Sequence, residues 1–184
     1  MKKLVLLLAL GAACVAHAQT TNAPLTYFEA YCAVADAPLL KGMSSVGLLN
    51  DQITYPVEVR AERLYNMQTS NAVYAVSLRT RVSRQALVIN YIDYDELDGL
   101  IRGIQLISQA DHTTSPMDNF EAVYRTRCGL SILKVSNGNR LTVVIKSGDP
   151  AATRNQLAPF VLDDLGKFLT AAKAKLDAVA AGGQ

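Results

Sequence analysis

The stretch "ALVINYIDYDELDGLIRGIQLIS" at residues 86–108 changes its periodicity halfway, and this change decides the fold class. Residues 86–92 are almost all apolar or β-branched, which is typical of an interior strand. From residue 97 onward the apolar residues recur three or four apart and share one helical stripe, formed by Leu97, Leu100, Ile101, Ile104 and Ile107. The stretch therefore predicts a strand that is followed at once by an amphipathic helix.

The junction between these two elements carries signals for a helix start. Asp93 as N-cap, with Glu96 three residues later, predicts a capping box at the start of the helix. Gly99 and Gly103 each weaken the helix by about 1 kcal/mol relative to Ala, but both permit close packing against a sheet. We therefore expect this helix to pack closely on a sheet.

The order of elements is similar on both sides of this helix. Before the quoted stretch, apolar and polar residues alternate over 57–62 and 74–82, with turn formers at 66–71 between them, which predicts two more strands. After a linker at 111–119, strands are expected at 120–124, 130–135 and 141–147, and "SNGNR" at 136–140 carries the Asn-Gly signal of a tight hairpin. A final helix that begins near Pro159 has its apolar stripe on Leu165, Phe168, Leu169, Ala172 and Leu176.

Both halves, at about 54–110 and 118–178, thus have the order β-β-β-α. This order predicts an α+β fold of two tandem units, with antiparallel sheets each covered by a long helix. The segment "YFEAYCAVA" at 27–35 fits a short helix or a strand, and we favour the helix. We expect a single globular domain over 19–180 and a flexible tail at 181–184.

This order of strands and helices resembles the arrangement in Whirly and PUR-type proteins, which bind single-stranded nucleic acid on their sheets. The resemblance covers about residues 54–178 and is one of order only, without a diagnostic motif. The chain departs from that class because it has an export signal, a balanced charge and no basic and aromatic platform. We therefore expect the likeness to concern the fold and not the activity.

The first 18 residues have the pattern of a secretory signal peptide. Lys2 and Lys3 precede an apolar run, and small residues lead to a cleavage site between Ala18 and Gln19. A competing interpretation is a lipoprotein, because "GAAC" at 11–14 partly matches a lipobox that would be acylated at Cys14. We expect a periplasmic or secreted bacterial protein, with the lipoprotein as the less favoured alternative.

The charge balance argues against nucleic acid as a partner. Removal of the leader takes Lys2 and Lys3 from 18 basic residues and none from 16 acidic residues, which leaves 16 of each. A chain without net charge has no overall field that draws it to DNA, RNA or anionic lipid. Beyond the leader, no segment has the apolar length of a transmembrane helix, so we expect no transmembrane segment in the mature chain.

Removal of the leader leaves two cysteines, Cys32 and Cys128. An oxidising compartment favours a disulfide between them, and the alternative is two buried thiols that act as small apolar side chains. The disulfide is the favoured prediction.

The sequence offers no convincing catalytic or metal-binding set. His112, the histidine that remains after cleavage, lies in the linker and is interpreted as solvated. Asp93, Asp95 and Asp98 are the best metal candidates, but they lack the loop of an EF-hand and already suit the first turn of a helix. We therefore expect no metal, no cofactor and no catalytic residue.

The candidate ligand-binding residues are four arginines in two Arg-Thr-Arg triplets. Arg79 and Arg81 share one face of a strand, as do Arg125 and Arg127, so the pairs could bind a carboxylate, a phosphate or a sulfated glycan. The competing interpretation is a solvated face whose arginines pair with neighbouring acids. Aligning the two halves shows that the triplets are not equivalent positions of a duplication.

Three functions remain open from the sequence. The leading hypothesis is a non-enzymatic binding domain for a protein partner or a small anionic ligand, with a homodimer also possible. The alternatives are an envelope structural protein tethered by lipid and a hydrolase whose active site is assembled from residues distant in sequence.

Overall fold

The computed structural model describes residues 25–50, 56–81, 87–147, 154–157 and 161–182. The first sheet has the antiparallel order β1-β2-β3-β4. Its strands are β1 (Leu39–Leu49), β2 (Val57–Asn66), β3 (Ala72–Arg81) and β4 (Leu87–Asp93). The predicted leader, its cleavage site and Pro159 lie outside the described residues.

The second sheet is built on three consecutive antiparallel strands, to whose edge a short strand is added. The three strands are β5 (Asn119–Arg125), β6 (Ser131–Asn137) and β7 (Arg140–Lys146), and β8 (Arg154–Leu157) pairs with β7. In the β6–β7 hairpin Asn137 pairs with Arg140, so the turn residues are Gly138, with φ +57°, and Asn139. The predicted hairpin is confirmed, and the helices α1 (Tyr27–Cys32), η1 (Tyr94–Glu96), α2 (Leu97–Gln109) and α3 (Val161–Gly182) complete an α+β fold.

Strand β1 was not predicted, so the first sheet has four strands and not three. Its sequence "LLKGMSSVGLL" contains two glycines and two adjacent serines, which weaken the strand signal. A β-bulge between Ser45 and Gly47 also shifts the register against β2 and breaks the regular alternation.

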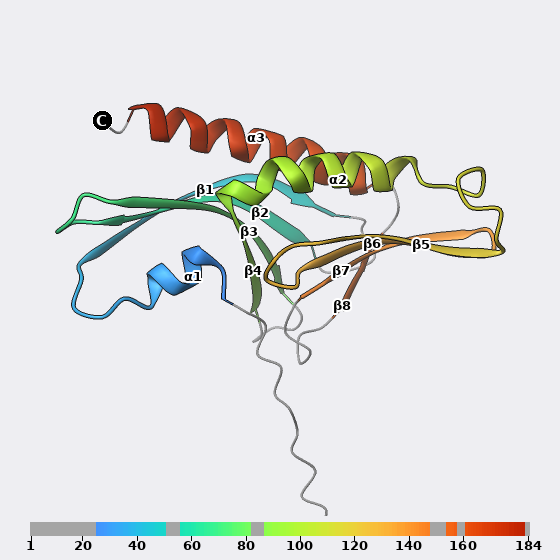
Figure 1. Cartoon of the computed structure of the whole chain (residues 1–184), viewed down its shortest axis with the longest axis horizontal. Coiled ribbons are helices and arrows are strands. Elements are labelled where there is room, and N and C mark those ends of the chain that lie inside the picture. Colours follow the sequence, from blue (N-terminus) through green and yellow to red (C-terminus); the bar gives the residue numbers. More distant parts are fainter. Residues whose placement is uncertain (1–24, 51–55, 82–86, 148–153, 158–160, 183–184) are drawn as a thin grey trace, which may run out of the picture.

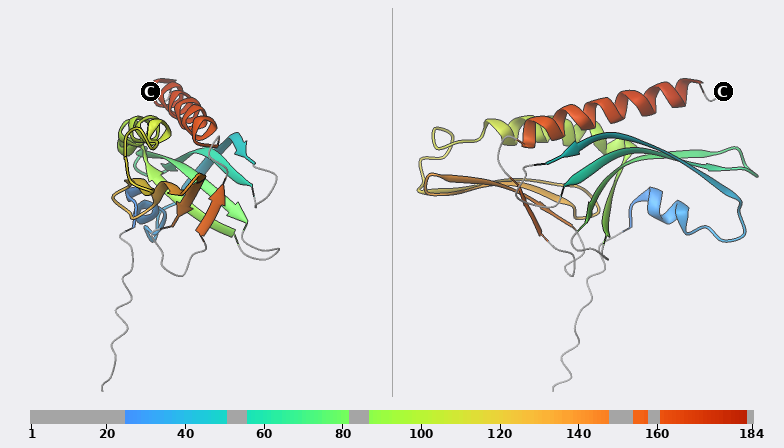
Figure 2. Two further views of the ribbon diagram at one scale, coloured as in Figure 1. Left: turned by 90° about the vertical axis from the view of Figure 1, so that its right-hand side faces the viewer. Right: turned by 180° about the vertical axis from the view of Figure 1, so that it is seen from behind.

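The two long helices lie side by side on one side of both sheets (Figures 1 and 2). Their contacts cross between the halves, because α3 packs mainly on β1, β2 and β3, whereas α2 packs on β5 and β6. The α+β class with antiparallel sheets is therefore confirmed, but two self-contained units, each closed by its own helix, are not observed.

Glycines leave room for an aromatic ring where α2 packs on the second sheet and where α3 packs on the first sheet. A Cβ at Gly103 of α2 would lie 2.2 Å from Cδ2 of Tyr124 on β5, and one at Gly99 would lie 2.8 Å from the Tyr124 hydroxyl. At the other contact, a Cβ at Gly47 of β1 would lie 2.5 Å from Cδ1 of Phe168 on α3. The prediction that Gly99 and Gly103 permit close packing on a sheet is confirmed.

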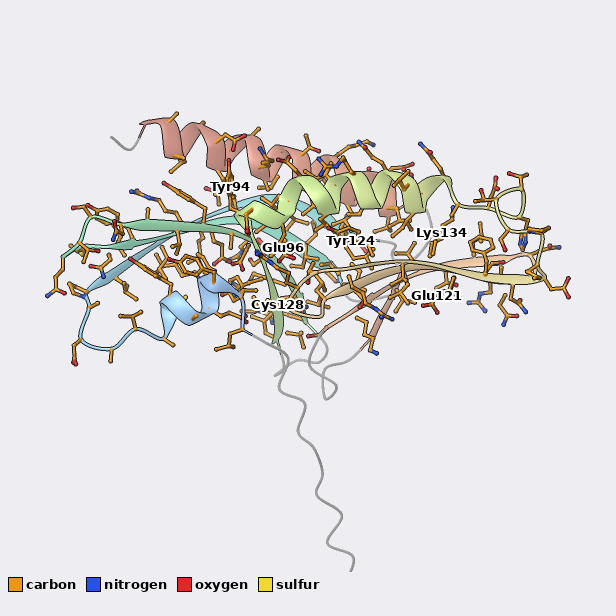
Figure 3. The ribbon with its side chains drawn as sticks, in the orientation of Figure 1. Tyr94, Glu96, Glu121, Tyr124, Cys128 and Lys134 are labelled. Carbon is orange, nitrogen blue, oxygen red and sulfur yellow. The ribbon has the colours of Figure 1, made fainter. Side chains whose placement is uncertain are left out.

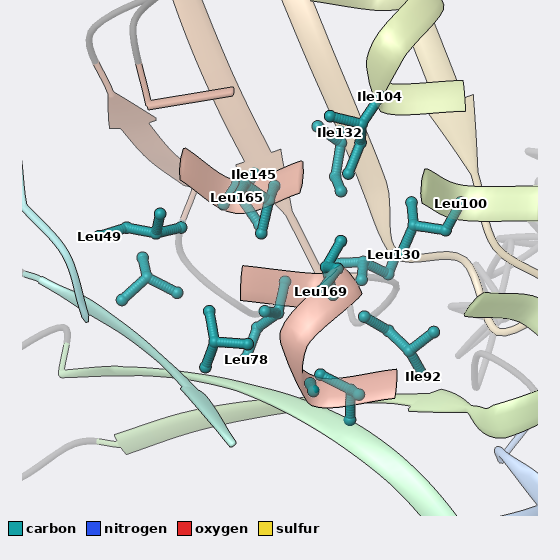
Figure 4. Close-up of a cluster of buried hydrophobic side chains, with 14 of the residues drawn as sticks. Leu49, Leu78, Ile92, Leu100, Ile104, Leu130, Ile132, Ile145, Leu165 and Leu169 are labelled. Atoms are coloured by element: carbon teal, nitrogen blue, oxygen red, sulfur yellow. The ribbon is translucent and has the colours of Figure 1, made fainter. Parts of the chain in front are cut away.

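One buried cluster joins both sheets and both long helices (Figure 4). The first sheet contributes Leu49, Leu78 and Ile92; α2 contributes Leu100 and Ile104; the second sheet contributes Ile132 and Ile145; and α3 contributes Leu165 and Leu169. Burial of such side chains is worth about 1.5–3 kcal/mol each. The stability of each sheet therefore depends on side chains from the other half of the chain.

Helix α1 covers part of the opposite face of the first sheet. Its Phe28 is fully buried against Leu64, Val73 and Ala75. Thr26 and Glu29 form a capping box at its start, so the short helix predicted here is confirmed.

The predicted role of Asp93 and Glu96 at the next helix is wrong. The Asp93 carboxylate accepts hydrogen bonds from the backbone N–H groups of Tyr27 (2.8 Å) and Phe28 (3.0 Å), so it caps α1 from across the fold. It makes no capping hydrogen bond to η1, and Glu96 binds the turn after β5. A short 3₁₀ turn separates Asp93 from α2, and Glu96, although it is the N-cap residue of α2, makes no capping hydrogen bond with its side chain.

Candidate functional site

The four candidate arginines are distributed over different parts of the molecule. Arg79 and Arg81 lie on β3, on the face of the first sheet that turns away from α3. Arg125 is the last residue of β5, whereas Arg127 lies in the turn that follows. Arg125 and Arg127 therefore do not share a strand face as expected, because β5 ends two residues before Arg127.

Arg79 belongs to a buried polar cluster around Glu62. Arg79 Nη1 is 3.8 Å from Glu62 Oε1, Ser77 donates a 2.5 Å hydrogen bond to the same oxygen, and Lys41 Nζ is 2.6 Å from Oε2. Burial opposes protonation of Lys41, but hydrogen bonds to Glu62 and to the hydroxyl of Tyr91 outweigh it and raise the pKa of Lys41. Because Glu62 is fully buried, these cations compensate a charge within the protein.

Arg127 is held by three carboxylates. Its guanidinium lies 2.6 Å from Asp95 Oδ1, 3.5 Å from Glu96 Oε1 and 3.8 Å from Asp93 Oδ2, and its backbone N–H donates to Glu96 Oε1. The hydrogen bond to Asp95 is the main reason why the pKa of Arg127 is raised. Arg127 thus joins the β5–β6 turn to η1.

A groove of about 660 Å³ opens beside Arg127. Its walls come from the start of α1, the start of β3, the β4–η1 junction and the β5–β6 turn, and they include Tyr27, Tyr74, Asp93 and Cys128. Burial raises the pKa of the Cys128 thiol, and the nearby carboxylates Asp93 and Glu96 raise it further. The thiol is therefore protonated at neutral pH and is a poor nucleophile.

The predicted disulfide is not present in the structure. Cys32 is an exposed free thiol at the last residue of α1, and Cys128 is a half-buried free thiol in the β5–β6 turn. Cys128 lines the groove together with Thr26, the N-cap residue of α1, and with Tyr27 and Ala30 of the helix. Cys128 therefore lies near the N-terminal part of α1, whereas Cys32 is the last residue of this helix.

The acids that were weighed as metal ligands have partners within the protein. Asp93 caps α1 and Asp95 binds Arg127, while Asp98 Oδ1 lies 3.7 Å from Lys173 Nζ on α3. Within the described part of the chain, no group of three or more His, Cys, Asp or Glu residues is arranged to hold a metal ion.

His112 is exposed, as expected, and its ring also contacts three groups of the protein. Its Nδ1 is 3.2 Å from the carbonyl oxygen of Met117, and its Nε2 is 3.1 Å from that of Gly138 and 3.0 Å from the hydroxyl of Ser136. The ring therefore holds the linker against the β6–β7 hairpin.

Arg125 lies on the open face of the second sheet, which turns away from α2. Figure 3 shows Glu121 on this open side, whereas Tyr124 and Lys134 lie between the sheet and α2. Lys134 Nζ donates a hydrogen bond to the carbonyl oxygen of Ser108 near the end of α2, so the ammonium group has a partner within the protein. The alternation along β5 and β6 thus separates a helix-bound face from a solvent face.

The open face is hollowed to a volume of about 520 Å³. Its lining consists of Glu121 and Arg125 from β5, Leu133, Val135 and Asn137 from β6, and Arg140, Thr142, Val144 and Lys146 from β7. Arg125, Arg140 and Lys146 are exposed, and no acidic group among the described residues lies within ion-pair distance of them. The hollow therefore carries one acid, Glu121, and three cations that have no acidic partner among the described residues.

Sequence reasoning found Arg125 but missed Arg140 and Lys146. The sequence contained the signal for these two residues, because every second residue of a strand points to the same face. On β7 the residues that share the face of Arg140 are Thr142, Val144 and Lys146. The hairpin register, Asn137 opposite Arg140, then determines which β7 residues lie beside each residue of β6.

Comparison with known proteins gives no family assignment. No family model and no curated protein matches the chain. A solved structure from work described as "Mutations in SsgB correlate to longitudinal cell division during sporulation of Streptomyces coelicolor" is 16% identical to it. The alignment covers 76% of this chain and 89% of that chain, with a TM-score of 0.26. A likeness this distant supports no conclusion about fold or function. The architecture itself defines the class, which is an α+β protein with two antiparallel sheets.

Within the described residues, no helix is both long and apolar enough to span a membrane.

Proposed function

We propose that this is an exported, non-enzymatic binding protein whose open face on the second sheet binds an anionic ligand or partner. The observation that carries the proposal is the contrast between the cations. Arg125, Arg140 and Lys146 have no acidic partner among the described residues, whereas Arg79 and Arg127 are paired with carboxylates. Cations that line a hollow without an internal partner can form charge-assisted hydrogen bonds with a ligand.

The geometry of the strands supports recognition of a compact anion at one end of the hollow. Arg125 pairs with Ser131, which in turn pairs with Lys146, so the two cations lie in one row across β5, β6 and β7. Two strand spacings separate their backbones by about 10 Å. Long flexible side chains can therefore converge on one carboxylate, phosphate or sulfate group between them.

Binding rather than chemistry is supported by the state of the nucleophilic and basic groups. The Cys128 thiol has a raised pKa, and the ring nitrogens of His112 contact backbone carbonyls. Neither group lines the hollow on the second sheet.

A titration of the chain that begins at Gln19 with inorganic phosphate tests the proposal. We expect amide NMR shifts on β5, β6 and β7, which disappear when Arg125, Arg140 and Lys146 are all replaced by Gln. The matched control replaces Arg102, Lys167 and Lys175, which are exposed on α2 and α3, by Gln, because it changes the net charge equally. Equal loss of binding in both triple variants would show that the effect is one of net charge and would refute the site.

We also propose that the two halves repeat one order of elements, with their helices exchanged. The supporting observation is that β2-β3-β4-α2 and β5-β6-β7-α3 follow each other along the chain, while α2 packs on β5 and β6 and α3 packs on β1, β2 and β3.

A further inference from the structure

We infer that the ligand of the open face is an amphiphile with one acidic head group and an apolar body. The head group lies between Arg125 and Lys146, and the body covers the apolar side chains next to them. This inference rests on the proposed anion-binding function and adds the class of ligand.

The register of the second sheet arranges its open face in rows. The row next to Arg125, Ser131 and Lys146 consists of Val123, Leu133 and Val144. Neighbouring rows on one face are two residues apart along each strand, which is about 7 Å. An apolar band therefore begins directly beside the cationic row and crosses all three strands.

The apolar band has no cover from the described elements on this face. Val123 is 41% exposed, and Leu133 and Val144 are half-buried. Val135 extends the band by one further position on β6. Covering these side chains by a ligand would remove apolar surface from water, which favours binding by about 25 cal/mol per Å².

The arrangement disfavours an extended polyanion, such as a sulfated glycan. The third cation, Arg140, lies in the row of Asn119 and Asn137, six residues along β7 from Lys146 and thus about 20 Å away. The apolar band and the acid Glu121 lie between. A polyanion crossing this interval would meet apolar side chains and a like charge, whereas an amphiphile needs only one cationic end.

The size of the hollow limits the apolar body. Its volume of about 520 Å³ falls in the range of sites for small organic molecules, roughly 300–1,000 Å³. The site therefore suits a short aliphatic chain or one or two rings, which carry a carboxylate, phosphate or sulfate.

A series of unbranched carboxylates tests this inference on the chain that begins at Gln19. The probes are acetate, butanoate, hexanoate and octanoate, below their aggregation concentrations, with amide NMR shifts on β5–β7 as the readout. Full burial of a methylene gives a four-fold gain in affinity, from about 0.8 kcal/mol per CH₂. We expect a gain of two- to four-fold per methylene, and no measurable binding of the neutral octanamide at equal concentration.

Two substitutions on the apolar band give opposite expectations. Val144→Thr replaces a methyl by a hydroxyl of similar shape and should weaken octanoate binding several-fold while acetate and phosphate binding stay unchanged. Thr142→Val, on the same strand and face, should strengthen octanoate binding without an effect on acetate. Circular dichroism and thermal unfolding establish that both variants remain folded.

The outcomes separate this inference from the proposed function. If affinity does not depend on chain length but phosphate still binds, the surface binds anions and the amphiphile is wrong. If neither phosphate nor any carboxylate binds, the proposed function itself fails. Binding to vesicles of anionic lipid without binding to monomeric octanoate would identify a membrane surface as the ligand and would also overturn the inference.

Discussion

The ring of Tyr124 on β5 lies where a side chain of residue 103 on α2 would lie, since a Cβ there would be 2.2 Å from Tyr124 Cδ2. A helix from the first half of the chain is thereby held close to a sheet from the second half. The aromatic ring takes the place of the missing side chain, and the contact tolerates no larger residue at position 103 without rearrangement.

Gly103→Ala should destabilise the protein although alanine is the better helix former. The gain in helix propensity is about 1 kcal/mol. Overpacking against Tyr124 costs about 1–3 kcal/mol, so we expect a net loss of stability. Gly166→Ala on α3 is the matched control, because its Cβ would lie 3.7 Å from Ile104 Cγ2, an ordinary contact. Denaturant unfolding should show a lower midpoint for the first variant and an unchanged or higher one for the second; a stabilising Gly103→Ala would contradict the close contact.

Separate halves of the chain should not fold. Residues 19–110 lack α3, which packs on the first sheet, and residues 111–184 lack α2, which packs on the second. Each fragment alone should therefore show broad, poorly dispersed NMR signals, and mixing the two should restore native dispersion. A fragment that unfolds cooperatively on its own would show that the exchanged helices are not required.

Asp111 should titrate far below an ordinary aspartate. Its carboxylate accepts hydrogen bonds from the hydroxyl of Thr113 and the backbone N–H groups of Thr114 and Thr113, which lower its pKa from 3.8 to about 2. Because the folded pKa is depressed, the contribution to stability is present above the unfolded value near 4 and is lost as pH falls toward 2. Carbon NMR of the carboxyl group should give a midpoint of about 2.

Thr113→Val should raise this midpoint toward 3.8, because the Thr113 hydroxyl is the largest cause of the shift. The control is Thr114→Val, which removes a hydroxyl at 3.3 Å and the smallest cause, so it should change the midpoint less. Equal effects of the two variants would rule out this order of contributions.

Cys32 and Cys128 should be two free thiols that react slowly. Burial raises the pKa of both Cys32 and Cys128, so little thiolate is present at pH 7. Mass spectrometry of the unreduced, alkylated protein should show two modified cysteines, with a rate below that of glutathione. Absence of modification without reductant would support the disulfide that the sequence predicts. The same spectrum gives the N-terminus, for which cleavage predicts Gln19 and lipoprotein processing predicts an acylated Cys14.

Strands with regular alternation or a continuous apolar run could be predicted from sequence, whereas β1, which has neither, could not. The pattern of Val57, Val59 and Ala61 identifies β2 because every second side chain is buried. β1 escaped because Gly42, Gly47 and a bulge interrupt its pattern.

The candidate site was predictable in part. The alternation of side chains along β7 and the two-residue turn suffice to predict that Lys146 lies beside β6 on the open face. Predicting that Lys146 and Arg125 lie in one row also requires the register between β5 and β6, which the sequence does not give. The partners of Arg127 and Asp93 could not be predicted, because they are brought together from segments 31 to 66 residues apart. Such contacts depend on the tertiary fold and leave no local pattern.

The placement of α3 has a consequence for synthesis. A polypeptide emerges from the ribosome starting at its N-terminus, and the helix that packs on β1, β2 and β3 is the last element of the chain. The inner surface of the first sheet therefore stays unsealed until translation reaches Gly182. Closure of the first sheet is therefore a late event in the folding of the chain.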